Sequence, residues 1–463
     1  MPERKRVAVL ADSDTRWKWG ALTARRLVPD HELTGYLLRG RATPTARQLG
    51  EVGVRADRLA EVTCAEFLTE IERERYDVVV LALVGGAVQA VLHGARALWP
   101  APARRPVFVT GYVGVVYEKL ADGLLLRHGA DLVLANSRHD AERFRAVYEG
   151  VGADAGAVTE TALPFLGGAP YEPAGSRAHT VVFAVQPSVP DSRADRAYLL
   201  ERAAGHARKH PDREVLIKLR SKPGEHTTHL EEQPYQRLAE KVPGGLPANC
   251  RLVYGNMGEV LDGTDLLVTV SSTAALESLH RSIPTAILTD LGVREALGNH
   301  HFLGSGCLAS WDQLDSGLLP EGDPVWLAAQ GVTTPGAPGP AGTGRPAGTG
   351  PAGGPAVALP GAAAGGDAYA VARAKVAGLL AATRLPSPAP YYTLTTAPGY
   401  LPGILARHRL APDGRPLPGA AGQEAGESRL RRRLRAHLRE AARGAYRHGV
   451  QRVAPVIRRL GEL

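Results

Sequence analysis

Short apolar runs rich in β-branched residues alternate with segments of helical periodicity along the first 290 residues. The first set of runs predicts strands at 6–11, 33–38, 77–83, 106–110 and 131–135. The second set predicts strands at 180–185, 214–219, 250–254, 265–270 and 284–288. Strands that are apolar along their whole length and separated by helical spacers are typical of parallel sheets covered on both faces.

The spacers predict amphipathic helices at 56–75, 138–147, 194–209, 235–241 and 273–281. Between the two sets lies a segment rich in Gly and Pro, 164–176, which suits a linker. We therefore expect an α/β fold made of two tandem, doubly wound Rossmann-like domains. The first would span residues 1–165 and the second residues 177–330.

The composition changes abruptly beyond the second domain. Residues 331–366 contain 12 Gly and 7 Pro in 36 positions, a composition that buries too little apolar surface to fold, so we expect a disordered linker. Residues 367–427 predict one helix, 367–383, followed by irregular chain. Residues 428–463 predict an amphipathic, Arg-rich helical tail.

Nearly all of the positive charge lies in that tail. The chain of 463 residues has a formal net charge of +8. Residues 428–460 hold 11 Arg and one Glu, a net charge of +10, which leaves −2 for the rest. A body without excess positive charge argues against nucleic-acid binding. The tail fits an anionic membrane surface, and a solvated or partner-packing helix is the alternative.

The cysteines and the N-terminal residues indicate the cellular compartment in which the protein is expected. Cys64, Cys250 and Cys307 are far apart and lack the spacing of a disulfide framework or a zinc site. The apolar segment 7–11 is too short for the core of a signal peptide or for a membrane span. We expect a cytoplasmic protein, with the tail placing it peripherally at the inner face of the membrane.

The turn after the first predicted strand carries the first candidate site. It has no GxGxxG, and no GxxxxGK[ST] occurs in the chain, which disfavours a dehydrogenase and a P-loop NTPase. Ligands of open α/β sheets bind at the carboxyl ends of strands. The turn places five candidate acceptor-side or catalytic residues at such an end: Asp12, Ser13, Asp14, Arg16 and Trp17. Helix capping and core packing are the structural alternatives.

The Asp12-Ser13-Asp14 sequence also matches the DxD pattern with which many glycosyltransferases hold a metal and a nucleotide diphosphate. That pattern usually follows a complete nucleotide-binding half-domain, whereas here it follows the first strand. We therefore predict no metal or other cofactor.

The second candidate site follows the predicted strand 265–270. Ser271, Ser272 and Thr273 stand where this strand meets the next helix, and Glu277 lies one helical turn beyond Thr273. Three hydroxyls beside the free N–H groups of a helix start predict a phosphate site.

Cations and an amide follow neighbouring strands of the second domain. Lys218, Arg220 and Lys222 follow strand 214–219, and Gln186 follows strand 180–185. These side chains could complete a phosphate cradle. A solvated basic loop is the alternative.

The first domain offers a further strand end. Gly111 and Tyr112 follow strand 106–110, and glycine permits close approach of a ligand. Glu118, a few residues on, is a second candidate general base besides Asp14.

With these residues in place, the chain resembles glycosyltransferases of the GT-B fold. Residues 180–310, with Ser271 and Ser272, are similar to bacterial sialyltransferases, capsule polysialyltransferases and CDP-glycerol-type transferases, whose Ser-Ser(Thr) motif binds the donor phosphate. Residues 1 to about 330 also resemble an actinobacterial family that is described only as glycosyltransferases. This likeness implies that a nucleotide-sugar binds the second domain and an acceptor binds the first.

The leading hypothesis is an inverting, metal-independent glycosyltransferase that transfers a sugar to a cell-envelope glycan or lipid-linked acceptor. A CMP-activated sugar acid is one candidate donor. Two alternatives stay open: a nucleotide-sugar isomerase of the 2-epimerase type, and a non-catalytic binding or scaffold protein on the same fold.

Overall fold

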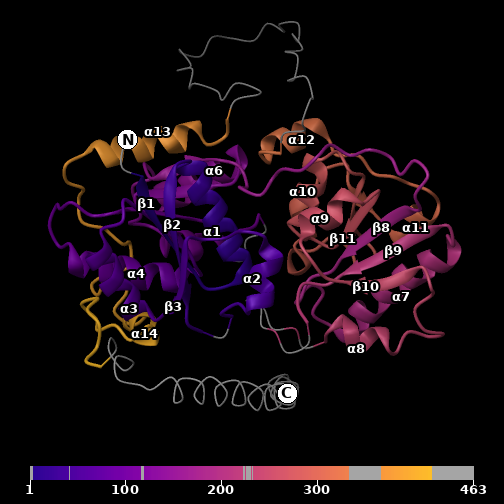
Figure 1. The fold of residues 1–463 in the computed structure, drawn as a ribbon, viewed down its shortest axis with the longest axis horizontal. Coiled ribbons are helices and arrows are strands. Elements are labelled where there is room, and N and C mark those ends of the chain that lie inside the picture. The colour runs from indigo at the N-terminus through magenta and orange to yellow at the C-terminus, as the bar shows by residue number, and fades with distance from the viewer. Residues whose placement is uncertain are drawn as a thin grey trace, which may run out of the picture.

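A computed structural model of the chain describes residues 4–40, 42–115, 119–222, 225, 231, 233–332 and 367–419. These residues form two α/β domains that lie side by side (Figure 1). The prediction of two tandem, doubly wound domains is confirmed. Residues 333–366 of the predicted linker 331–366, and the whole Arg-rich segment 428–463, fall outside the described residues.

The first sheet is parallel and runs in the order β3-β2-β1-β4-β5-β6-β7. Its strands are β1 Lys5–Ala11, β2 His31–Leu38, β3 Arg58–Val62, β4 Val78–Ala82, β5 Val107–Gly111, β6 Leu132–Ala135 and β7 Val158–Glu160. Its helices are α1 Asp14–Leu27, α2 Ala46–Val52, α3 Cys64–Glu74, α4 Gly85–Leu98, α5 Leu120–Leu125 and α6 Arg138–Gly150.

The second sheet repeats this topology with the order β10-β9-β8-β11-β12-β13. Its strands are β8 His179–Ala184, β9 Arg213–Lys218, β10 Cys250–Val253, β11 Leu266–Thr269, β12 Thr285–Leu288 and β13 Leu308–Ala309. Its helices are α7 Arg193–Lys209, α8 Tyr235–Ala239, α9 Met257–Asp262, α10 Ala274–His280, α11 Trp311–Asp315 and α12 Pro324–Ala329, with 3₁₀ turns at Glu295–Leu297 and Asn299–Phe302.

The order of the strands reverses at one point in each sheet, between β1 and β4 and between β8 and β11. In open α/β sheets a ligand binds outside the carboxyl ends of the strands at such a switch point. At the first switch point α1 lies unusually close to the sheet, because a Cβ on Gly20 would stand 2.6 Å from Val9 Cγ1. Tight packing of this helix fixes the turn that precedes it.

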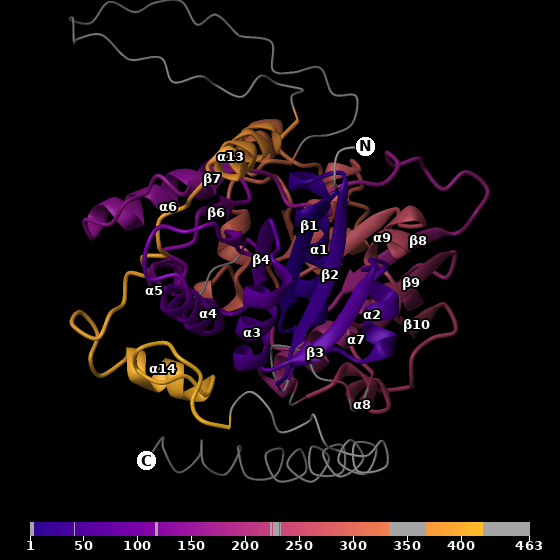
Figure 2. The same ribbon diagram turned by 60° about the vertical axis from the view of Figure 1, so that its left-hand side comes forward.

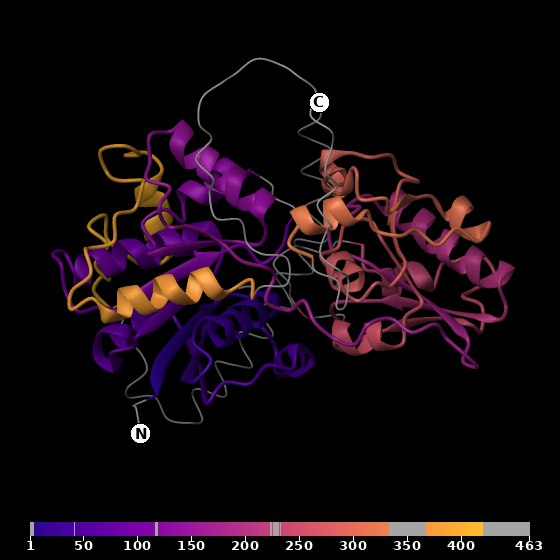
Figure 3. The same cartoon turned by 90° about the horizontal axis from the view of Figure 1, so that it is seen from above.

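The chain returns to the first domain after residue 366, as Figures 2 and 3 show. Helix α13 (Ala370–Ala381) buries Ala372 and Val376 in the same apolar cluster as α1. Helix α14 (Leu401–Arg407) buries Leu401 and Leu405 on the opposite face, beside α4. The prediction of a helix at 367–383 agrees with α13, whereas α14 lies in a segment predicted to be irregular.

One predicted helix was partly wrong. Residues 56–75 were expected to be a single amphipathic helix, but residues 58–62 form the edge strand β3 and only α3 follows as a helix. Four of the five β3 residues are exposed, so the strand lacks an apolar run and its pairing with β2 determines its conformation. The capping box of Thr63 and Glu66 then starts α3.

The state of the cysteines and the character of the helices can now be compared with the sequence. All three cysteines are free and buried. Within the described residues, no helix has both the length and the apolar character that crossing a membrane requires.

We predict that residues 367–419 contribute to the stability of the first domain. Leu405→Ala, at a fully buried position, is expected to lower the free energy of unfolding by about 2–5 kcal/mol, because it leaves a cavity beside α4. Leu394, which is 46% exposed, provides the matched control. Leu394→Ala should change the free energy of unfolding by less than about 0.5 kcal/mol. Denaturant unfolding measures both, and equal effects would contradict the assignment.

Candidate active site at the interdomain junction

The carboxyl edges of the two sheets meet where the domains touch, and several ion pairs cross this junction. The turn after β1 contributes Asp12, Ser13 and Asp14 from the first domain. The turns after β8, β9 and β11 contribute residues from the second. The sequence placed its candidate residues at these same strand ends.

The turn after β1 is held by its own side chains. Asp12 Oδ1 pairs with Arg16 Nη1 at 2.9 Å, and Asp12 Oδ2 accepts a hydrogen bond from the Val84 N–H at 2.9 Å. Ser13 caps α1 by accepting from the Arg16 N–H. Asp12 therefore ties the ends of β1 and β4 together across the switch point, which leaves Asp14 as the carboxylate that faces the other domain.

Asp14 pairs directly with Arg220 of the second domain. Arg220 Nη2 lies 2.7 Å from Asp14 Oδ1 and also donates to the Thr15 hydroxyl. Burial of Asp14 acts to raise the pKa of its carboxyl, but the charge and hydrogen bond of Arg220, together with the hydrogen bonds from Thr15, outweigh burial and lower that pKa below its ordinary value. The carboxylate is thus held ionised between the domains.

A second ion pair crosses the junction beside the first. Lys18 Nζ, on α1, lies 3.4 Å from Glu277 Oε2 on α10 and 4.9 Å from the centre of the Phe165 ring. Burial is the largest influence on Glu277 and raises its pKa, although Lys18 acts in the opposite direction. Glu277 therefore faces the first domain through Lys18.

Helix α2 supplies a third set of contacts. Arg47 pairs with Glu225 of the second domain and with Glu51 of its own helix. The Gly255 N–H donates to Glu51 Oε1 at 3.1 Å, and Asn256 Nδ2 donates to the Glu51 carbonyl at 2.9 Å. Sequence reasoning missed these residues, because no local motif marks a helix face that only the docking of the two domains brings into contact.

The three hydroxyls of the Ser271-Ser272-Thr273 turn differ in burial: the first is bonded inside the domain and the other two are partly exposed. Ser271 is buried, and its hydroxyl donates to the Leu297 carbonyl at 2.6 Å while its N–H donates to Gln186 Oε1 at 3.0 Å. Ser272 and Thr273 are only partly buried. Thr273 Oγ1 lies 3.1 Å from where a Cβ on Gly114 would stand, so this turn approaches the first domain closely. Gln186 and Ser271 thus shape the turn that presents the next two hydroxyls.

The basic residues after β9 also differ in their surroundings. Lys218 is buried, donates to the Leu219 carbonyl at 2.7 Å, and has its pKa lowered to about 8 by burial. Arg220 reaches Asp14. Lys222 is exposed, with Nζ 5.6 Å from the centre of the Tyr254 ring, and its N–H donates to Glu225 at 2.8 Å. Arg220 is therefore the member of this group that meets the first domain directly.

The remaining candidates of the first domain surround β5 and α1. Trp17 is buried in the core, where its indole N–H donates to the Val54 carbonyl. A Cβ on Gly111 would stand 2.9 Å from the Leu134 carbonyl oxygen, so glycine is required for packing there. The Tyr112 ring lies 4.0 Å from the buried guanidinium of Arg127. Glu118 lies outside the described residues.

Taken together, the junction holds Asp14 against Arg220 and Glu277 against Lys18, and the turn that carries Ser272 and Thr273 approaches the first domain at Gly114. Such an arrangement can hold an anionic leaving group on the second domain and remove a proton on the first.

Two facing Rossmann-like domains that meet at their switch points define a GT-B-like α/β protein. A family model matches residues 7–339 and is described as "Putative glycosyltransferase (DUF6716)". The chain belongs to this family, and glycosyltransferase is the class of enzyme that the description gives. No curated protein matches the chain by sequence.

Several solved structures have a similar arrangement. S. aureus MnaA with UDP is 13% identical, with a TM-score of 0.46, over 72% of this chain and 92% of that one. UDP-GlcNAc 2-epimerase from Neisseria meningitidis is 11% identical, with a TM-score of 0.45, over 71% and 94%. The spinosyn rhamnosyltransferase SpnG complexed with thymidine diphosphate is 14% identical, with a TM-score of 0.40, over 67% and 88%.

We predict that Asp14 and Arg220 are energetically coupled. A double-mutant cycle of Asp14→Ala and Arg220→Ala should give a coupling of about 0.5–3 kcal/mol in the free energy of unfolding at pH 7. Because the pKa of Asp14 is lowered in the folded protein, the coupling is full above the ordinary aspartate pKa of about 3.9 and is lost as the pH falls through the lower folded value.

The exposed pair Arg251 and Glu214 serves as the control for this cycle, with an expected coupling of about 0–1 kcal/mol. A coupling between Asp14 and Arg220 no larger than in this control would contradict the prediction.

Proposed function

We propose that the protein is an inverting, metal-independent glycosyltransferase that uses a nucleotide-sugar donor. The observation that supports this most is the direct contact of Asp14 with Arg220 at 2.7 Å, at the meeting point of the two switch-point edges. A transfer between two substrates requires a group that accepts the acceptor's proton and a group that holds the leaving phosphate. Asp14 and Arg220 are matched to these two tasks and come from different domains.

The donor would bind the second domain. Ser272 and Thr273 present hydroxyls at the end of β11, and Gln186 and Ser271 hold that turn in place. Arg220 would grip the phosphate as a planar fork, with Lys218 and Lys222 adding positive charge. These cations offset the charge that develops on the departing nucleotide, which is the interaction that usually contributes most to such catalysis.

Asp14 would act as the general base. In a single displacement, the acceptor oxygen forms a bond to the sugar's anomeric carbon as the bond from that carbon to the phosphate oxygen breaks. The acceptor's proton moves to Asp14, and the bonding electrons leave with the nucleotide. Glu118 remains the second candidate base.

The donor phosphate and Asp14 would compete for Arg220. In the absence of donor, Arg220 keeps the pKa of Asp14 low, which makes the carboxylate a weak base. When phosphate takes over the guanidinium, burial is left as the main influence and the pKa of Asp14 rises. The base would thus become effective only after the donor has bound.

Metal independence follows from the same charges. Asp12 is paired with Arg16, and Asp14 with Arg220. Asp12 is therefore engaged within its own turn, and Lys218, Arg220 and Lys222 would offset the phosphate charge that a metal otherwise offsets.

For the acceptor we propose a cell-envelope glycan or a lipid-linked precursor, reached from the cytoplasmic face of the membrane. The support is in the sequence of residues 428–460, whose net charge of +10 suits an anionic surface. A CMP-activated sugar acid remains one donor to be tested.

We predict that a nucleotide raises the melting temperature of the protein. A thermal-shift panel of CMP, CDP, UDP, GDP and thymidine diphosphate should identify the base. Arg220→Ala and Ser272→Ala/Thr273→Val should abolish the shift, because they remove phosphate contacts. Arg251→Ala, at the exposed position of β10, should keep it. No shift with any nucleotide would count against the donor site.

Asp14→Asn is expected to lower kcat by about 10²–10⁴-fold, because it removes the base. It should also tighten donor binding, because the competitor for Arg220 loses its charge. Steady-state kinetics and calorimetric titration with the nucleotide measure the two effects. A variant with wild-type kcat would exclude Asp14 and move the role to Glu118, tested as Glu118→Gln.

The two alternatives give different outcomes in that assay. A 2-epimerase would convert a UDP-sugar with no acceptor present. A scaffold protein would turn over no donor, and Asp14→Ala would leave its cellular function intact.

The lowered pKa of Lys218, about 8, predicts a pH dependence of donor binding. The side chain is charged below pH 8 and neutral above it, so the affinity for a nucleotide diphosphate should fall by up to about tenfold per pH unit as the pH rises beyond 8. Lys218→Met should bind more weakly at pH 7 and show no such fall. Calorimetric titrations at pH 7 and 9 compare them, and the same slope in both proteins would rule out a contribution from Lys218.

A further inference from the structure

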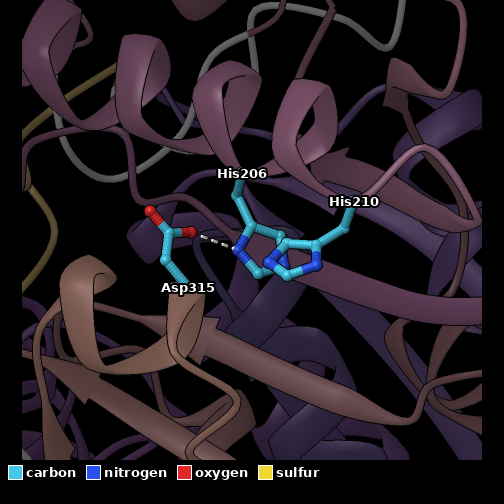
Figure 4. Close-up of side chains that lie close together, drawn as sticks. All are labelled: His206, His210 and Asp315. Atoms are coloured by element: carbon cyan, nitrogen blue, oxygen red, sulfur yellow. Dashed lines mark hydrogen bonds and ion pairs between the residues drawn. The ribbon is translucent and has the colours of Figure 1, made fainter.

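Two histidines and a carboxylate lie together on the second domain, on the side away from the first (Figures 1 and 4). His206 lies in the last turn of α7, His210 caps the end of that helix, and Asp315 ends α11. Their potential ligand atoms all lie within 4.8 Å of one another. None of the three takes part in the interdomain junction.

The residue types and their spacing suit a transition metal. Histidines four residues apart project from the same face of a helix, and the carboxyl end of a helix favours a cation. Two imidazoles and one carboxylate are a common ligand set for zinc, with a water molecule completing the tetrahedron.

The existing hydrogen bonds show what a metal would replace. His206 Nδ1 lies 2.6 Å from Asp315 Oδ1, so a single proton now joins the two groups where a metal could bridge them. His210 Nε2 is buried and has no hydrogen-bond partner among the described residues. The rings of His206 and His210 are 4.5 Å apart between centres. Small movements that bring one atom of each group to equal distances from a single ion would turn the three adjacent groups into three ligands.

We propose that His206, His210 and Asp315 bind one divalent transition-metal ion, with zinc as the best match. The ion would join α7 to α11 and would stabilise the second domain. This site is independent of the proposed transfer reaction, which takes place at the junction and needs no metal.

Two arginines contact the proposed ligands and would compete with a bound metal ion. Arg213 Nη1 lies 3.3 Å from His206 Nε2, and Arg202 Nη2 lies 3.4 Å from Asp315 Oδ2. Binding at Nδ1 places the imidazole proton on Nε2, so Arg213 must turn away. Arg213 therefore opposes the metal.

The test is a titration of the full-length, tag-free protein with Zn²⁺ after removal of metal by a chelator. We expect one saturable Zn²⁺ per chain and a higher melting temperature with Zn²⁺. His210→Ala and Asp315→Asn should each weaken the affinity at least tenfold. Asp315→Asn keeps an acceptor for His206, so the fold is preserved. His300→Ala, at an exposed histidine elsewhere, should bind like the wild type.

A gain-of-affinity variant separates this proposal from a purely structural His206–Asp315 pair. Arg213→Leu should bind Zn²⁺ more tightly, because it removes a cation that competes for His206. Co²⁺ in place of Zn²⁺ should give the visible absorption of a four-coordinate ion, which His210→Ala abolishes. Binding that is absent, or that His210→Ala and His300→Ala change equally, would overturn the proposal.

Discussion

The ion pair between Asp14 and Arg220 is the interaction on which the candidate site depends. It joins a carboxylate that follows β1 to a guanidinium that follows β9, and so holds the carboxyl edges of two separate sheets against each other. Neither group is fully exposed, so the pairing is screened less by solvent than a surface ion pair is. The same contact sets the low pKa of Asp14. The same ion pair therefore helps to hold the two domains together and sets the pKa of the proposed base.

The rest of the junction supports that contact. Two further ion pairs, Lys18 with Glu277 and Arg47 with Glu225, have the opposite polarity and place cations of the first domain against carboxylates of the second. In each pair, the opposite charge of the partner offsets the cost of taking a charged group out of water. Arg220, Lys18 and Arg47 are thus each paired with a carboxylate across the interface, so an anionic substrate that binds Arg220 must exchange places with Asp14.

Much of the fold could be predicted from the sequence. Buried strands such as β1, β4 and β11 are continuous apolar runs, and their periodicity is local information. The edge strand β3 was missed because its residues are mostly exposed, and α14 because it is short and lies between turns. Candidate residues were found where a polar cluster follows an apolar strand, as at Asp14 and at Ser271. Trp17 and Gly111 were grouped with them, but the Trp17 ring is buried in the core and Gly111 leaves no room for a Cβ beside Leu134.

Two doubly wound domains, the strand ends at which polar residues gather, and a basic tail next to a nearly neutral body could all be read from the order of the residues. This was possible because hydrophobic periodicity, turn chemistry and charge are properties of neighbouring residues. Folding was needed to show that Asp14 contacts Arg220, that Ser271 turns inward to the Leu297 carbonyl, and that His206 and His210 lie beside Asp315. These contacts join residues 26 to 206 positions apart, and such distances close only when the sheets form and dock.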